Sequence, residues 1–118
     1  MNDIEKSKLY TDSWRHFGAD TQIDICIEEF SELIQAFIKA RRNGVVFTHN
    51  VYEEIADVTI CLEQIEHHLK SIPRASSFNV IGDNGNQYDS VLEAKMKKLE
   101  RFREFVTLSV EHSNKSKE

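Results

Sequence analysis

The scarcity of helix-breaking residues is the feature that most constrains how this chain can fold. The 118 residues include one proline and four glycines, and apolar residues recur at helical spacing over long stretches between them. Strand signals are weak. This pattern predicts an all-α fold. Because 118 residues fit one domain, we expect a single domain over residues 1–112, followed by a frayed tail over residues 113–118.

Four helices are expected, and their ends carry recognisable signals. They cover residues 3–17, residues 20 or 21 to 42, residues 50–71 and residues 87–110. Gly18 ends the first helix. Gly44 ends the second, since glycine readily takes the left-handed conformation of a C-cap. Pro73 stops the third helix, and a loop over residues 74–86 follows. The short link over residues 43–49 favours an antiparallel hairpin of the second and third helices.

Charge and cysteine content exclude several classes of protein. The net charge of −5 gives a surface that repels phosphate backbones, so no nucleic-acid polymer is expected as a partner. No apolar run approaches the roughly 18 residues of a membrane span, and the first residues have no signal-peptide pattern. Cys26 and Cys61 lack CxxC spacing, which suits a reducing cytoplasm. We interpret both as small core residues.

Two acidic segments are the candidates for chemistry. Residues three apart on a helix share a face, so each segment provides a pair of carboxylates. The pairs are Glu29 with Glu32 and Glu54 with Asp57. Acidic pairs are also common on solvated helix faces, and this alternative suits Glu28 and Glu53, which project onto the polar sides of their helices.

Glu29 and Glu54 do not fit a solvated face. At about 100° per residue, each projects into the apolar stripe of its helix, with Glu32 and Asp57 at the margins of the same stripes. Neither stripe contains a Lys or Arg. Burial of a carboxylate without compensation costs several kcal/mol. The sequence therefore predicts a cation that offsets this cost.

The register of the hairpin brings the two pairs together. In an antiparallel pair, facing residues have numbers with a constant sum, so Glu29 faces Asp57 at the height where Glu32 faces Glu54. Four carboxylates at one place repel unless cations hold them. Oxygen ligands without Cys or His point to Mg²⁺, with Mn²⁺ as a possible substitute. The same register places Cys26 near Cys61.

The acidic motifs resemble those of the MazG-like all-α nucleoside triphosphate pyrophosphohydrolases, which have Glu-Glu-x-x-Glu on one helix and Glu-x-x-Asp on the next. The matching segments are Glu28-Glu29-Phe30-Ser31-Glu32 and Glu54-Ile55-Ala56-Asp57. The opening Trp14-Arg15-His16-Phe17-Gly18, followed by Gln22, is similar to short, phage-type members. The resemblance covers roughly residues 14–103.

This resemblance implies a four-helix MazG-like bundle that assembles as a homodimer or homotetramer. It implies Mg²⁺-dependent hydrolysis of a nucleoside triphosphate, a dNTP or a non-canonical NTP, between the α- and β-phosphates, giving NMP and pyrophosphate. The implied metal ligands and catalytic residues are Glu29, Glu32, Glu54 and Asp57. The competing interpretation is a non-catalytic helical interaction module or nucleotide-binding module.

Further residues are candidates for substrate binding, each with a structural alternative. Gln22 and Gln64 face each other in the predicted register and either line a pocket beside the metals or end the bundle as plain polar residues. Trp14 or Phe17 either stacks on the base or packs in the core. Three cations of the fourth helix either hold the β- and γ-phosphates or form a solvated face. They are Lys95, Lys98 and Arg101.

Overall fold

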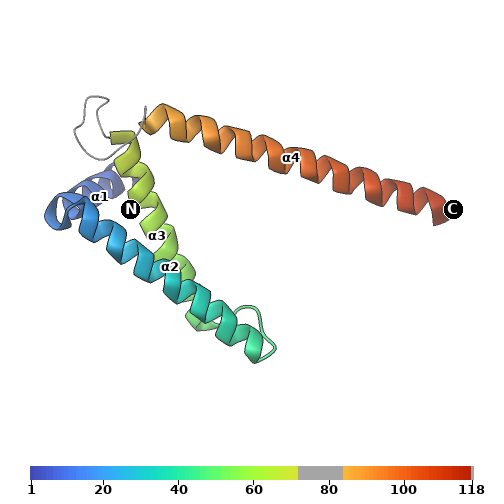
Figure 1. Cartoon of the computed structure of the whole chain (residues 1–118), viewed down its shortest axis with the longest axis horizontal. Coiled ribbons are helices and arrows are strands. Elements are labelled where there is room, and N and C mark those ends of the chain that lie inside the picture. Colours follow the sequence, from blue (N-terminus) through green and yellow to red (C-terminus); the bar gives the residue numbers. More distant parts are fainter. Residues whose placement is uncertain (72–83, 118) are drawn as a thin grey trace. The chain divides into compact units, whose positions relative to one another are not determined.

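The computed structural model describes residues 1–71 and 84–117, which form four helices (Figure 1). They are α1 (Asp3–Phe17), α2 (Ala19–Arg42), α3 (His49–Ser71) and α4 (Asn84–Lys117). The described ranges contain no strand, so the all-α prediction is confirmed. The chain divides into two compact units, Met1–Ser71 and Ile72–Glu118, whereas the sequence led us to expect one domain over residues 1–112. We describe each unit by itself.

Helix α1 has the bounds that the sequence predicts. A capping box begins it: the Asn2 side chain accepts a hydrogen bond from the Glu5 backbone N–H at 2.8 Å, and the Glu5 carboxylate accepts one from the Asn2 backbone at 3.3 Å. Gly18 ends it with φ +82° and donates its N–H to the carbonyl of Trp14 at 2.8 Å. The chain then enters α2 directly.

The bounds of α2 and α3 differ slightly from the predicted ones. The second helix was expected to begin at residue 20 or 21, but α2 begins at Ala19 and its N-cap is Gly18, without a side-chain hydrogen bond. The expected C-terminus at Arg42 is confirmed, with Gly44 at φ +72°. Helix α3 begins at His49, one residue earlier than expected, where the hydroxyl of Thr48 accepts the backbone N–H of Val51 at 3.1 Å.

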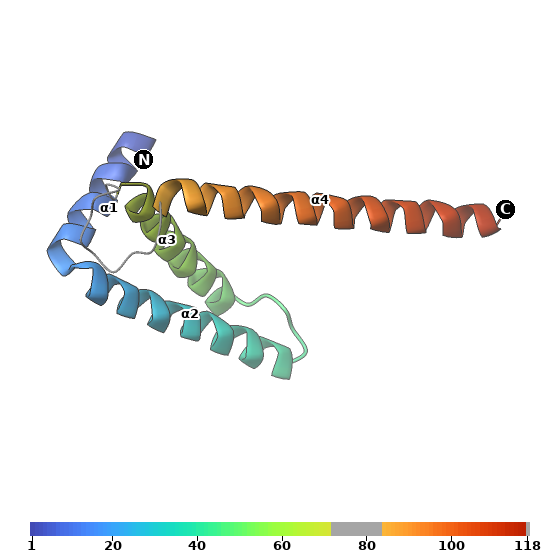
Figure 2. The ribbon, with the colours of Figure 1, turned by 45° about the horizontal axis from the view of Figure 1, so that its top comes forward.

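Helices α2 and α3 form the expected antiparallel hairpin, and α1 packs against both (Figures 1 and 2). Small side chains fill the contact between the two long helices. Ala36, Ala40 and Val51 form a buried cluster near the connection, and Phe37 packs on it. Cys26 and Cys61 are buried toward the other end. Small residues at these positions bring the two backbones close, so side chains on facing turns lie within direct reach.

Helix α4 is longer at both ends than its apolar pattern predicts. Residues 84–86, expected in a turn, are helical, and so are residues 113–117, expected to be frayed. The apolar periodicity stops near Val110 because the following residues are polar, but a helix needs only its backbone hydrogen bonds to continue. The rest of the expected loop, with Pro73 and Asp83, lies outside the described residues. No helix within the described ranges is long and apolar enough to cross a membrane.

Candidate metal centre

Carboxylates from α2 and α3 meet at one place in the hairpin. One oxygen each from Glu29, Glu54 and Asp57 lies within 4.8 Å of the other two. Glu32 completes the group, since its carboxyl lies within reach of Glu54 and its charge acts on that residue. The neighbouring charge that acts most strongly on Glu29 is that of Asp57, and the one that acts most strongly on Glu54 is that of Glu32. This is the pairing that the predicted register requires, so the register is confirmed.

The electrostatics of this cluster disfavour its charged form. Burial raises the pKa of Glu29 above its ordinary value of 4.5, and the negative charges around it, that of Asp57 first, raise it further. The pKa of Glu54 is raised for the same reasons, by burial first and then by Glu32 and Asp57. Desolvation and like charge both oppose ionisation of a carboxyl. A bound divalent cation would reverse both effects.

Two carboxylate oxygens have no hydrogen-bond partner. Oε2 of Glu29 and Oε2 of Glu54 are both buried and unpartnered in the described structure. Buried polar atoms are nearly always paired, so each exception calls for an explanation. Among the described residues, the recorded ion pairs do not involve any of the four clustered acids. By contrast, exposed Glu53 pairs with His49 at 2.8 Å.

The donor set fits a hard divalent cation. Every ligand is a carboxylate oxygen, which Mg²⁺ prefers over nitrogen or sulfur. The four acids come from two helices that pack directly on one another, and each helix contributes two of them. Glu28 lies in the same acidic segment but is exposed, as expected for a residue on the polar side of α2. The residues that could hold a metal are therefore Glu29, Glu32, Glu54 and Asp57.

A cleft of about 250 Å³ adjoins the carboxylates and is bounded by all three helices of the first unit. Its lining residues are Ser13, Phe17, Gln22, Ile25, Glu29, Asp57, Ile60, Cys61 and Gln64. Both predicted glutamines are therefore beside the acidic cluster. Gln22 is only 4% exposed. Its amide nitrogen donates to the hydroxyl of Ser13 at 3.0 Å and to the Ser13 carbonyl at 3.4 Å.

The two cysteines lie near the acidic cluster but do not belong to the candidate ligand set. Both are free and buried, as predicted for core residues. Burial, followed by the neighbouring Cys26 thiol, raises the pKa of the Cys61 thiol to about 12. Since the thiolate is the form that attacks electrophiles or binds metals, this environment keeps Cys61 inert at neutral pH.

Trp14 is placed differently from the other candidate substrate residues. Its indole stacks on the ring of His68, with ring centroids 3.9 Å apart and an interplanar angle of 20°. It is not among the residues that line the cleft, whereas Phe17, one turn later on α1, is. This placement favours the packing alternative for Trp14. A pattern of aromatic residues on one helix does not say which of them faces a cleft, and of the two aromatic candidates only Phe17 lines it. Sequence reasoning missed Ser13 as a lining residue.

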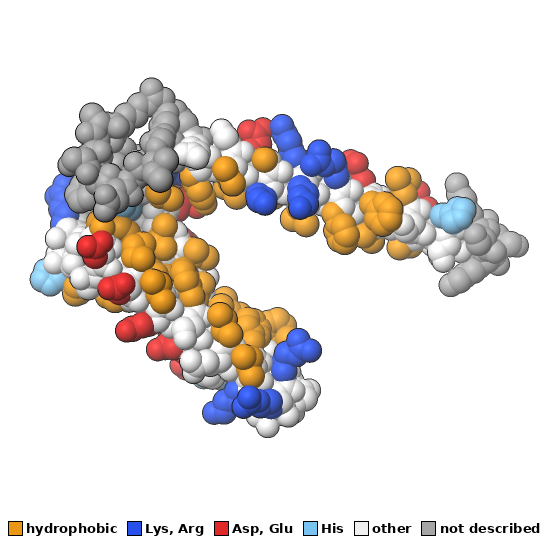
Figure 3. Space-filling model, in the orientation of Figure 1, with side chains coloured by type: hydrophobic (Ala, Val, Ile, Leu, Met, Phe, Trp, Pro, Cys, Tyr) orange, Lys and Arg blue, Asp and Glu red, His pale blue; other side chains and the backbone are white. Residues whose placement is uncertain are grey.

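The candidate phosphate ligands belong to the second unit. Lys95, Lys98 and Arg101 all lie on α4 and are exposed. Figure 3 shows Lys and Arg side chains gathered along the middle of this helix. On the same helix, Lys97 forms an ion pair with Glu93 at 3.3 Å. The contact of the three candidate residues with phosphate stays a prediction.

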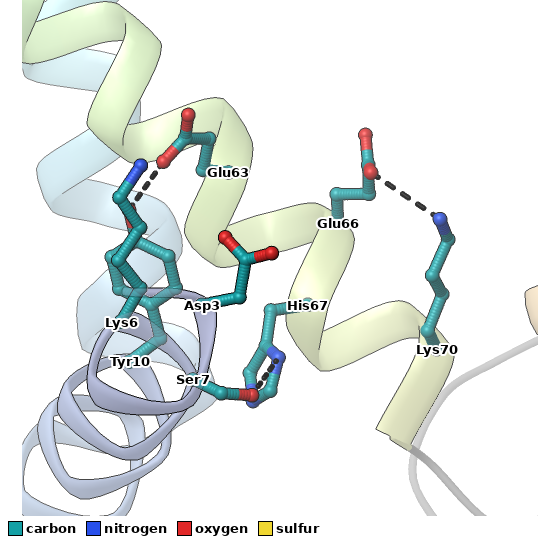
Figure 4. A pocket seen from close by; sticks show the side chains of 8 residues that line it. All are labelled: Asp3, Lys6, Ser7, Tyr10, Glu63, Glu66, His67 and Lys70. Atoms are coloured by element: carbon teal, nitrogen blue, oxygen red, sulfur yellow. Dashed lines mark hydrogen bonds and ion pairs between the residues drawn. The ribbon is translucent and has the colours of Figure 1, made fainter. Parts of the chain in front are cut away.

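A second, larger cleft of about 380 Å³ lies between α1 and α3, and most of its polar side chains form hydrogen bonds or ion pairs with one another (Figure 4). The hydroxyl of Tyr10 donates to the carboxylate of Glu63. This hydrogen bond is the main cause that raises the pKa of Tyr10 to about 12, and burial is the second cause. His67 lies 2.9 Å from the hydroxyl of Thr11 through its Nε2. We interpret these contacts as the attachment of α1 to α3.

Comparisons of the chain with protein-family models, with curated proteins and with solved structures each gave no match.

Proposed function

We propose that Glu29, Glu32, Glu54 and Asp57 bind Mg²⁺, with Mn²⁺ as a possible substitute, and that the protein hydrolyses a nucleoside triphosphate to NMP and pyrophosphate. The observation that carries this proposal is the pair of buried carboxylate oxygens without partners, set among like charges. A solvated acidic face would leave these oxygens in water. A structural acid would have a hydrogen-bond donor or a cationic side chain beside it.

The arrangement suits hydrolysis of a phosphoanhydride. When bound, Mg²⁺ would neutralise phosphate oxygens and supply a hydroxide-like water at neutral pH. The four carboxylates would hold it between α2 and α3, on helices rather than on loops, which keeps the ligand positions precise. Glu29 and Asp57 also line the cleft with Gln22 and Gln64, so the uncharged end of a nucleotide has a place beside the acidic cluster.

The choice of a nucleoside triphosphate as substrate rests on the resemblance of the two acidic motifs to the MazG-like enzymes, together with this cleft. The same resemblance supports the candidate phosphate ligands Lys95, Lys98 and Arg101, a MazG-like bundle and a homo-oligomer. It also suits a cytoplasmic protein, where Cys26 and Cys61 would remain reduced.

The test is pyrophosphate release from a panel of canonical and modified NTPs and dNTPs, measured with Mg²⁺, with Mn²⁺ and with a chelator. Thermal melting is recorded under the same conditions. We expect metal-dependent release from at least one substrate, and a higher melting temperature with metal, because ligands that bind only the native state stabilise it. A non-catalytic interaction module would show neither response, and that result would overturn the proposal.

A further inference from the structure

The orientation of the Gln22 amide is determined by the groups around it. Its Nε2 lies 3.4 Å from the backbone carbonyl of Ser13 and 3.0 Å from the Ser13 hydroxyl. A carbonyl oxygen only accepts hydrogen bonds, so the amide nitrogen, and not the amide oxygen, must face it. The carbonyl of Ser13 therefore settles which end of the amide is the donor, an assignment that is otherwise ambiguous for glutamine.

The amide nitrogen of Gln22 is thus held by Ser13, and the carbonyl Oε1 is the group left for a ligand. Gln22 is 4% exposed and lines the cleft beside Glu29 and Asp57. A ligand that covers this acceptor binds better when it brings an N–H to it, because an acceptor buried by the ligand and left unpaired is costly.

The rest of the cleft suits a flat, largely apolar ring. Phe17, Ile25 and Ile60 contribute its apolar lining, and Phe17 offers an aromatic face. The cleft volume of about 250 Å³ leaves room for a heterocyclic ring with its substituents.

We propose that Gln22 is a specificity-determining residue that accepts a hydrogen bond from the exocyclic amino group on the base-pairing edge of cytosine or adenine, and that Ser13 is the positioning residue that presents Oε1 for this bond. The proposal rests on the proposed function, since it takes the base to be that of a nucleotide whose phosphates are bound at the acidic cluster. It specifies the chemical group of the base that the site recognises.

The substitution Ser13→Ala isolates the positioning role. It removes the 3.0 Å partner of the Gln22 amide and leaves only the longer contact to the backbone carbonyl. The amide can then turn and present N–H as well as C=O to the cleft. Ser13→Thr keeps the hydroxyl. Ser7→Ala is the matched control, since Ser7 is also a half-buried serine of α1, but its hydroxyl lies 3.4 Å from His67 and away from this cleft.

The experiment compares kcat/KM for pairs of triphosphates that differ in one N–H-bearing edge. The first pair is dCTP and the triphosphate of the pyrimidin-2-one deoxyriboside, and the second is dATP and the triphosphate of the unsubstituted purine deoxyriboside. Both analogues lack the exocyclic amino group and have no other N–H on that edge. For the better of dCTP and dATP, we expect the wild type to prefer the amino-bearing member by roughly 10- to 100-fold.

Ser13→Ala should bring this ratio close to one, whereas Ser13→Thr and Ser7→Ala should keep it within about twofold of the wild type. A wild-type ratio near one, or an unchanged ratio in Ser13→Ala, overturns this inference while the proposed function stands, because pyrophosphate is still released. If the wild type releases pyrophosphate from no triphosphate under any metal condition, the proposed function fails, and this inference fails with it.

Discussion

Glu53 and Glu54 are neighbours in the chain but have opposite environments. Glu53 is exposed and pairs with His49, while Glu54 has a buried oxygen without a partner and a pKa raised by burial and by Glu32. The difference of about 100° between adjacent helical positions is enough to turn one carboxylate to solvent and the other into the hairpin. The two acidic segments together contain six acids, and helical geometry brings four of them into one cluster.

The substitution Glu54→Gln tests whether the four clustered acids form a metal site. It keeps the shape of the side chain and removes one negative charge from the cluster. Without metal, we expect the melting temperature to stay equal or rise, because carboxylate repulsion falls. With Mg²⁺, pyrophosphate release should fall by about 100-fold or more, since a metal contributes several kcal/mol of charge stabilisation. Glu28→Gln is the control, since Glu28 lies in the same acidic segment of α2 but is exposed and outside the cluster. A Glu54→Gln protein that melts lower without metal and keeps its turnover would rule out the site.

The raised pKa values also predict how metal-free stability depends on pH. A carboxyl whose folded-state pKa lies above its ordinary value of 4.5 favours folding when protonated. Its contribution is fully present below 4.5 and is lost as pH rises through the raised folded-state pKa. The metal-free protein should therefore lose melting temperature over that window, and Mg²⁺ should restore it at neutral pH.

The comparison that isolates this effect uses the double variant Glu29→Gln with Glu54→Gln, which cannot ionise at either position. Melting temperature is measured against pH with a chelator present. The wild-type curve should descend more steeply than that of the variant. Parallel curves would show that the two carboxyls have ordinary pKa values and no strained environment.

At the scale of helices, the spacing of apolar residues and the positions of helix-breaking residues predicted the bounds of α1. They also predicted the antiparallel hairpin of α2 and α3 and its register. The acidic cluster followed from that register, because Glu29 and Asp57 occupy facing turns. The contact of Ser13 with Gln22 did not follow, because it depends on how α1 packs across α2. No periodicity within one helix records that crossing, and only the three-dimensional arrangement identifies Ser13.

Gly18 links α1 to α2 with a backbone conformation that few other residues can adopt. Its φ of +82° and ψ of +160° lie in a region that is essentially restricted to glycine. A Cβ at this position would meet nothing within 4 Å, so the cost of Gly18→Ala comes from the backbone alone. We expect the free energy of unfolding to fall by about 1–3 kcal/mol, measured by urea denaturation.

Gly44→Ala provides the comparison, since Gly44 also has a positive φ, of +72°, and open space around its Cβ position. It lies at the far end of the hairpin and should destabilise the fold without changing substrate preference. Gly18→Ala should also weaken discrimination between the paired triphosphates, because it moves α1 and Ser13 with it. An unchanged stability of Gly18→Ala would contradict a glycine-specific backbone conformation at this position.

At the scale of the whole molecule, both units expose more apolar surface than a monomer needs to. Figure 3 shows hydrophobic side chains gathered along the hairpin. On α2, four isoleucines share one helical face and are 39–60% exposed: Ile23, Ile27, Ile34 and Ile38. On α4, Phe102 and Phe105 are 62% and 68% exposed. Contiguous apolar surface of this kind on a small protein marks an interaction site.

The last prediction is therefore that the protein forms a homo-oligomer, a dimer or a pair of dimers, with the isoleucine face of α2 in the interface. A domain of this size buries only about two thirds of its unfolded surface, so burial of this face against a second copy would add stability that the isolated chain lacks. Light scattering at micromolar concentration should give at least twice the mass of one 13.7 kDa chain.

Ile34→Asp should shift the mass toward that of the monomer, because a carboxylate in an apolar interface is costly. Thr21→Asp adds the same charge to the opposite face of α2 and should leave the mass unchanged. A monomeric wild type would contradict the prediction, and an oligomer that survives Ile34→Asp would place the interface elsewhere.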